Sequence, residues 1–197
     1  MSRARTSCIA FVLAACALVP FAASAQVDVA GVKYETSTEL QGSKVQLNGA
    51  GIRYFGPFKV YAAGLYLGKK AATPEEALAQ PGAKRISVTM LRDIDAGELG
   101  KLFTRSVEDN MEKGSFVKLI PGLLRMSEIF SRFNKLKAGD SFTLDWIPGR
   151  GTVVSVRGVT QSESFKEPEF YQALMRIWLG PVPVDWKLKE RLLGKPA

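Results

Sequence analysis

The chain has 197 residues, two cysteines, no histidine and a formal net charge of +8. The absence of histidine excludes a Ser-His-Asp triad, a Cys-His pair, and zinc or haem held by histidine. The positive charge favours an anionic ligand or peripheral contact with an anionic membrane surface, and a basic domain without a polyanionic partner is the alternative.

The N-terminal segment predicts a cleavable signal peptide over residues 1–25. Arg3 and Arg5 give a positive start, residues 8–23 are uncharged, and Ala-Ser-Ala at 23–25 offers the small residues that signal peptidase requires. Cleavage before Gln26 would export the protein, and we expect it in the periplasm.

Two other interpretations of this segment stay open. A membrane anchor is disfavoured because the uncharged run is shorter than the roughly 20 residues of a spanning helix, and Pro20 interrupts it. A lipoprotein is the second alternative, since residues 13–16 resemble a lipobox that would place a lipid anchor on Cys16. Against it, residues 17–23 continue apolar where a lipidated N-terminus normally turns polar.

Residues 26–197 have the length of one domain that can bury its own core. Cleavage would remove Cys8 and Cys16, so the mature chain would have neither a disulfide nor a thiolate. Loss of Arg3 and Arg5 would lower the net charge to +6. No basic run in this part exceeds two residues, so we expect no nucleic acid partner, and the pattern predicts no cofactor and no metal site.

The first half of the domain predicts β-strands separated by turns. Strands are expected over residues 27–34, 44–54, 58–67 and 84–91, with Gly56-Pro57 as one turn. The segment 58–67 is mostly apolar on both faces, which predicts an inner strand covered on both sides. Its alternation places Tyr61 and Tyr66 on opposite faces.

Helices and a second group of strands follow. Thr73 caps a short helix over residues 73–79, Asp95 starts a longer amphipathic helix, and residues 116–133 form another that Pro121-Gly122 should break or kink. Two strands and two helices complete the chain: strands 141–147 and 152–159, a helix over residues 168–179, and a last helix capped by Asp185. This order predicts an α+β domain in which helices pack on one face of an antiparallel sheet.

Four polar side chains are candidates for ligand binding. Arg53 ends an apolar strand and could hold a carboxylate through two hydrogen bonds, or it could be a solvated strand end. Tyr61 and Tyr66 must bring their hydroxyls to a partner, which could be a ligand or the backbone. Asn110 lies among apolar helix neighbours and could bind a ligand or be a satisfied buried amide.

The order and spacing of several segments resemble the chalcone isomerase superfamily. They are similar to its bacterial exported branch of chalcone isomerase-like proteins, and the resemblance extends from about residue 27 to 194. The segments are LNGAGIR at 47–53, KVYAAGLYL at 59–67, VTM at 88–90, SVEDN at 106–110, WLG at 178–180, PVD at 183–185 and LLG at 192–194.

The resemblance implies an open-faced β-sandwich with a large antiparallel sheet, a layer of helices and a ligand cleft. It implies that Arg53 anchors the ligand and that Asn110 corresponds to a cleft asparagine. Tyr61 falls where isomerases have a threonine and fatty-acid-binding members have a tyrosine. Phe103 replaces a cleft tyrosine whose hydroxyl the isomerases use, which argues against chalcone cyclisation.

Taken with the residue pattern, the resemblance predicts a non-catalytic protein that binds a fatty acid or similar amphipathic carboxylate in an apolar cleft. Arg53 would pair with the carboxylate and Tyr61 would add a hydrogen bond. Two alternatives stay open, namely an isomerase or intramolecular lyase of unknown substrate and a cell-envelope interaction protein whose cleft is packed shut. Large side chains filling the space beside Arg53 would contradict the ligand hypothesis and favour the last of these.

Overall fold

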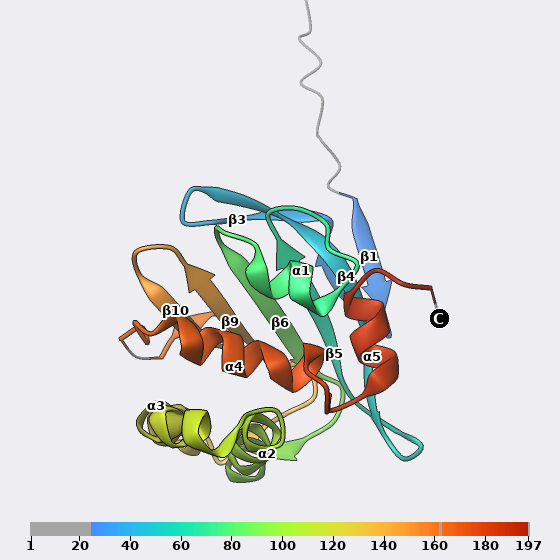
Figure 1. Cartoon of the computed structure of the whole chain (residues 1–197). Helices are drawn as coiled ribbons and strands as arrows, with labels where there is room; N and C mark the ends of the chain where they lie inside the picture. Colours follow the sequence, from blue (N-terminus) through green and yellow to red (C-terminus); the bar gives the residue numbers. More distant parts are fainter. Residues whose placement is uncertain (1–24, 162, 197) are drawn as a thin grey trace, which may run out of the picture.

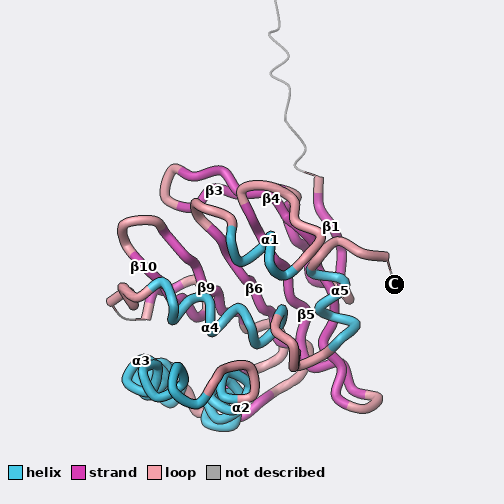
Figure 2. Tube along the Cα trace, viewed as in Figure 1, coloured by secondary structure: helices cyan, strands magenta, loops and turns pink. Residues whose placement is uncertain are grey.

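A computed structural model describes residues 25–161 and 163–196, so the predicted signal peptide, apart from Ala25, lies outside the described residues. A seven-stranded antiparallel sheet has the strand order β11-β10-β9-β6-β5-β4-β3. The described residues also form five helices, and Figures 1 and 2 show α1 and α4 over one side of the sheet, with α2 and α3 below. The predicted α+β class is confirmed. Within the described part of the chain, no helix has the length and hydrophobicity needed to cross a membrane.

The strands and helices have the following bounds. The strands are β1 (Gln26–Val29), β2 (Val32–Glu35), β3 (Ser37–Leu40), β4 (Ser43–Phe55), β5 (Phe58–Leu67), β6 (Lys84–Met90), β7 (Ile94–Asp95), β8 (Lys135–Leu136), β9 (Ser141–Ile147), β10 (Gly151–Val156) and β11 (Val159–Thr160). The helices are α1 (Pro74–Ala79), α2 (Ala96–Glu108), α3 (Lys113–Ser131), α4 (Pro168–Leu179) and α5 (Trp186–Leu192).

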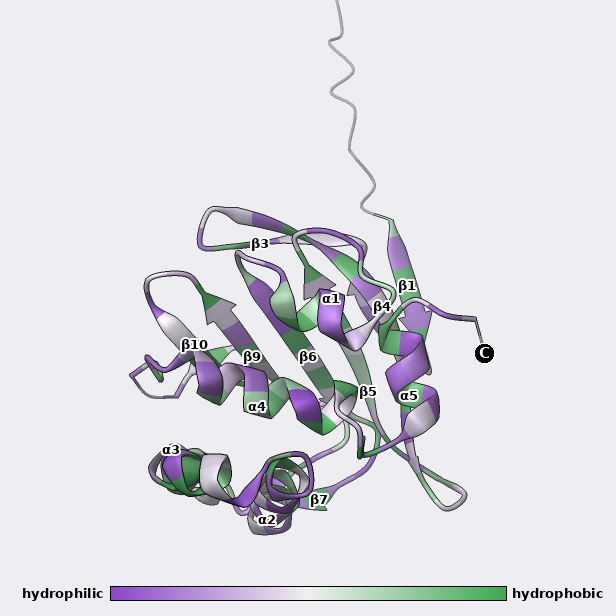
Figure 3. Cartoon of the chain, in the orientation of Figure 1, coloured by the Kyte–Doolittle hydropathy of each residue, from purple (hydrophilic) through white to green (hydrophobic). Residues whose placement is uncertain are grey.

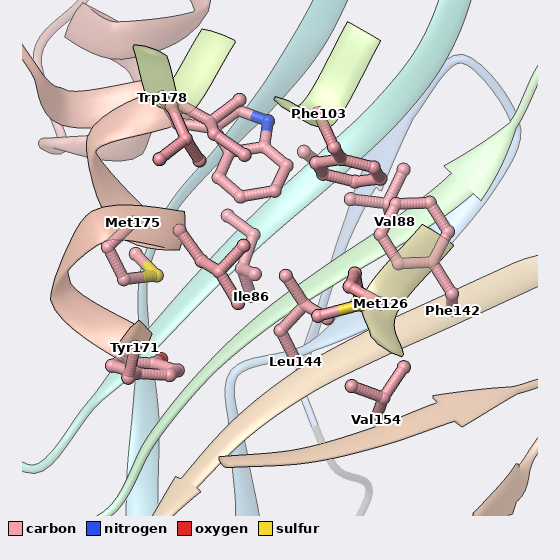
Figure 4. Packing of buried hydrophobic residues seen from close by; sticks show 14 of the residues in the cluster. Ile86, Val88, Phe103, Met126, Phe142, Leu144, Val154, Tyr171, Met175 and Trp178 are labelled. Atoms are coloured by element: carbon pink, nitrogen blue, oxygen red, sulfur yellow. The ribbon is translucent and has the colours of Figure 1, made fainter. Parts of the chain in front are cut away.

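The main core lies between the sheet and the helices. Hydrophobic and hydrophilic residues alternate along α4 and β6 in Figure 3, so each element turns one apolar face inward. Figure 4 shows α4 side chains meeting those of the strands. Those it labels are Ile86, Val88, Phe103, Met126, Phe142, Leu144, Val154, Tyr171, Met175 and Trp178. Burial of this apolar surface is the main source of stability.

The β1–β2 hairpin covers part of the opposite face of the sheet. Tyr34 of β2 belongs to a second buried cluster with Ala62 and Tyr66 of β5. Gly64 permits this approach, since a Cβ at that position would lie 2.7 Å from the Tyr34 ring. The prediction that β5 is an inner strand covered on both sides is therefore confirmed.

Two predicted strands are each interrupted by a tight turn. The expected strand 27–34 is the β1–β2 hairpin, whose turn places Ala30 and Gly31 at φ 55° and 83°. The expected strand 152–159 ends at Val156, because Arg157 and Gly158 adopt φ 52° and 77° before the short strand β11. Both turns need positive φ values, which glycine adopts without strain and which are uncommon for alanine and arginine.

Of the expected break or kink at Pro121-Gly122, the break is wrong, since α3 runs through both residues. Proline lacks an N–H and so removes one helical hydrogen bond. Pro121 is exposed, so water can bond the carbonyl that it leaves free. Gly122 turns inward, where a Cβ would lie 2.7 Å from the Phe170 ring. A close approach between α3 and α4 thus explains the glycine.

A β-bulge at Asn48 changes the side of the sheet to which the later side chains of β4 point. The register with β5 slips between Leu47 and Gly49. Before the slip, Leu47 packs on the hairpin side of the sheet, while beyond it Gly49 and Gly51 face α5. A Cβ on Gly49 would lie 2.0 Å from the carbonyl oxygen of Arg191, so only glycine admits α5 this closely. An extra residue in one strand shifts every later side chain to the other face.

Three hydrogen bonds hold the Asn48 side chain. Its Nδ2 donates to the carbonyl oxygens of Ala71 at 3.0 Å and Leu192 at 2.7 Å, and its Oδ1 accepts from the Ala71 N–H at 2.7 Å. The bulge is therefore attached both to the end of α5 and to the segment before α1.

We expect Asn48→Ala to lower the free energy of unfolding by about 2–4 kcal/mol, because it leaves buried backbone groups without partners. Urea unfolding measures this. Gln46→Ala, on the same strand but with one long hydrogen bond of 3.4 Å, is the matched control and should lose less than about 1 kcal/mol. Equal losses in the two variants would contradict the role given to Asn48.

Candidate ligand-binding site

Arg53 and Tyr61 are direct cross-strand partners on β4 and β5. Because the Asn48 bulge precedes it, Arg53 shares the helix side of the sheet with Tyr61, and its Cζ lies 5.6 Å from the centre of the tyrosine ring. Arg53 is half-buried, and its Nε is buried without a hydrogen-bond partner in residues 25–161 and 163–196. An unpaired buried donor costs free energy, so an acceptor placed here would be stabilising.

Tyr61 and Trp178 join the sheet to the end of α4. The indole Nε1 of Trp178 donates to the Tyr61 hydroxyl at 2.9 Å, and both side chains are buried. Burial raises the pKa of Tyr61 to about 12, against the lowering effects of Arg53 and the Trp178 hydrogen bond. At neutral pH Tyr61 is therefore a neutral phenol, and its hydroxyl proton can be donated to an anion.

The Asp185 carboxylate lies near this pair but is engaged elsewhere. Its Oδ1 accepts from the Leu188 N–H at 3.0 Å and caps α5, and its Oδ2 accepts from the Tyr54 N–H at 2.9 Å. Among the described residues, no carboxylate forms an ion pair with Arg53. The guanidinium thus keeps an unneutralised charge at the edge of an apolar interior.

Aromatic side chains fill the interior on this side of the sheet. Trp178 bonds to Tyr61, and Figure 4 shows Phe103 next to Trp178. The Phe103 ring centre lies 5.9 Å from that of Trp178 and 5.4 Å from that of Phe130. A cavity wide enough for an acyl chain would expose its walls, but Tyr61, Phe103 and Trp178 are only 4%, 4% and 1% exposed. The apolar cleft expected from the resemblance is closed in this structure.

Two hollows in the described structure lie away from Arg53. One, of about 580 Å³, is an open groove between α2 and α3 lined mainly by polar side chains. The other, of about 280 Å³, lies beside the Asn48 bulge and the start of β1. The first has no apolar wall, and in the second the Lys70 ammonium already donates to the carbonyl oxygens of Leu47 and Asn48, so neither has the character of a fatty-acid pocket.

Asn110 lies at the end of α2, and its side chain bonds to the backbone. Its Nδ2 donates to the carbonyl oxygens of Ser106 and Val182, both at 2.8 Å, and its Oδ1 accepts from the Val182 N–H at 2.9 Å. Gly180 leaves room for it, since a Cβ there would lie 2.1 Å from Oδ1. The contacts give Asn110 a structural role in fixing the segment that follows α4.

Tyr66 does not join Arg53 and Tyr61. It lies on the hairpin side of β5, buried with Tyr34 and opposite Arg85 of β6. Of the four candidates, only Arg53 and Tyr61 are brought together on one face.

The residue pattern gave no role to Trp178 or Asn48, and it predicted Asp185 only as the cap of the last helix, which is confirmed. A buried indole N–H needs an acceptor, but the pattern did not indicate which residue supplies it. Asn48 offered no signal, since a bulge depends on pairing between distant segments.

The chain belongs to the chalcone isomerase-like family, which matches residues 26–194. Among solved structures it is similar to a fatty-acid binding protein of Arabidopsis thaliana, with a TM-score of 0.66 and 17% sequence identity. That match covers 83% of this chain and 92% of the Arabidopsis chain, and at this identity it shows a shared fold. No curated protein matches the chain in sequence.

The raised pKa of Tyr61 gives a stability change at high pH. Between pH 10 and about 12, the unfolded chain releases the phenolic proton while the folded chain keeps it, so folding becomes less favourable as the pH rises. We expect the free energy of unfolding of the wild type to fall by about 2 kcal/mol more than that of Tyr61→Phe over this range. Urea unfolding at several pH values measures the difference, because contributions from the other tyrosines cancel. If the free energies of unfolding of the two proteins fell in parallel over this pH range, the raised pKa of Tyr61 would be contradicted.

Proposed function

We propose that the protein is an exported, non-catalytic binding protein for a fatty acid or similar amphipathic carboxylate, working in the periplasm. The observation that carries the proposal is the unpaired, buried Nε of Arg53 beside the neutral hydroxyl of Tyr61. A carboxylate offers two acceptor oxygens, one for the guanidinium and one for the phenol. The likeness of the fold to that of a fatty-acid binding protein supports this choice of ligand.

The acyl tail needs space that Trp178 now fills. Rotation of Trp178 away from the sheet would break its bond to Tyr61 and open the apolar interior beside Arg53. Two contacts of the segment that follows α4 stabilise the closed position of Trp178. Lys189 donates to the Gly180 carbonyl oxygen at 2.8 Å, and Asn110 hydrogen-bonds to Val182. Binding would then require the open conformation, so the apparent affinity would be the affinity of the open form multiplied by the fraction of molecules that are open.

The packed interior itself favours one alternative, an envelope interaction protein without a ligand. In that case Trp178 and Phe103 are permanent core residues and Arg53 is a half-solvated surface charge. The isomerase alternative gains less support, because the Phe103 ring offers no hydrogen-bond donor and packs against Phe130.

Arg53→Ala should weaken binding of a carboxyl-labelled ¹³C fatty acid on the order of 30-fold or more, because a desolvated charge loses its partner. The carboxyl chemical shift in an NMR titration reports both affinity and ionisation. Arg105→Ala, which removes an exposed arginine of α2, is the matched control and should bind as the wild type does. Equal binding by all three proteins would remove Arg53 from the site, and no binding by the wild type would favour the ligand-free interaction protein.

Trp178→Ala should bind the same fatty acid more tightly than the wild type, because the truncation opens the space that the tail needs. It should also lower the free energy of unfolding by about 3–5 kcal/mol. Trp178→Leu, which removes less volume, is the second variant in case the first does not fold. If a folded variant with this space opened bound the acid no better than the wild type, Trp178 would not be the barrier.

A further inference from the structure

One end of the molecule exposes four aromatic side chains. Tyr54, Phe55 and Phe58 at the end of the β4–β5 hairpin are 41%, 71% and 57% exposed, and Trp186 at the start of α5 is 61% exposed. We call these four residues the aromatic tip. Single exposed apolar residues are ordinary, but a group of large aromatic residues on a projecting end indicates a binding surface.

The aromatic tip is held together by contacts between the hairpin and α5. The Tyr54 N–H donates to the carboxylate of Asp185, the residue before Trp186, at 2.9 Å. Figures 1 and 2 show the hairpin extending beyond the sheet next to α5. Gly56 at φ 56° allows the two-residue turn that brings Phe55 opposite Phe58. The tip is thus a defined, projecting feature of the fold.

Basic side chains surround the aromatic tip. The Arg92 guanidinium lies 5.1 Å from the Phe58 ring centre. The Lys189 ammonium lies 4.9 Å from that of Trp186, but Lys189 is buried and donates to the Gly180 carbonyl oxygen, so it adds no exposed charge to the tip. Lys59 and Lys187 are exposed next to Phe58 and Trp186 in the sequence.

Nearby acidic groups are already bound. Both oxygens of Asp185 accept backbone hydrogen bonds, and Asp93 lies 3.5 Å from Lys135. The tip therefore presents aromatic rings within a rim of positive charge.

We propose that the aromatic tip docks on the surface of an anionic lipid bilayer. Tryptophan, tyrosine and phenylalanine rings settle at the boundary between headgroups and acyl chains, and lysine and arginine beside them attract anionic phosphates. The rim of positive charge is complementary to such a surface and selects it over a neutral one. Docking does not depend on the carboxylate site, since none of the four residues of the aromatic tip belongs to that site.

The test is co-sedimentation of the purified protein, residues 26–197, with vesicles of phosphatidylglycerol and phosphatidylcholine or of phosphatidylcholine alone. The wild type should bind the anionic vesicles at least about tenfold more strongly than the neutral ones. The double variants Phe55→Ser/Phe58→Ser and Lys59→Gln/Arg92→Gln should each weaken anionic binding about tenfold or more. Brominated lipids should quench the tryptophan fluorescence of the wild type, and this quenching should be lost in Trp186→Phe.

Val117→Ser/Leu124→Ser is the matched control, since it removes two apolar side chains of α3 that are each 61% exposed and leaves the tip intact. Circular dichroism confirms that each variant is folded. The proposal is overturned if the wild type ignores anionic vesicles, if the α3 variant loses as much binding as the tip variant, or if the tip instead drives a concentration-dependent dimer in ultracentrifugation. The assay contains no fatty acid, so its failure leaves the carboxylate proposal untouched.

Discussion

The bulge at Asn48 decides which side of the sheet carries Arg53. Without the extra residue, Arg53 would point to the same side of the sheet as Leu47 and lie under the β1–β2 hairpin, away from Tyr61. The side chain of Asn48 fixes the bulge to Leu192 and Ala71, so the end of α5 and the segment before α1 both depend on it. A bulge of this kind changes the direction of a side chain at low cost here, because one amide satisfies buried backbone groups of Ala71 and Leu192.

Because Arg53 lies on the helix side of the sheet, its unpaired positive charge is at the edge of the core. A guanidinium with an unpaired buried nitrogen lies against a neutral phenol, while Asp185, the carboxylate that could neutralise it, is held by backbone N–H groups. The interior beyond Tyr61 is closed by Trp178, whose N–H occupies the phenolic oxygen. The closed structure thus leaves no space for an acyl tail, and opening of the α4 end is the step on which binding would depend.

The sequence predicted those features that local pattern controls. Apolar residues on both faces identified β5 as an inner strand, and the cap residues Thr73 and Asp95 began helices where expected. The turns at Ala30 and Arg157 were missed because each places a residue other than Gly, Asn or Asp at positive φ. The Asn48 bulge and the closure by Trp178 could not be predicted, since both arise from contacts between segments far apart in the chain. For the site, the pattern chose Arg53 and Tyr61 but could not tell that Tyr66 faces away or that Asn110 bonds only to backbone groups.

Native mass spectrometry of the mature protein, isolated from the cells that make it without added lipid, addresses the carboxylate proposal most directly. The account predicts a bound mass that matches an acyl carboxylate in the wild type and only the bare chain in Arg53→Ala. A bare chain in both proteins, with no uptake when fatty acids are added back, would contradict the account and leave a protein whose closed interior is its permanent state.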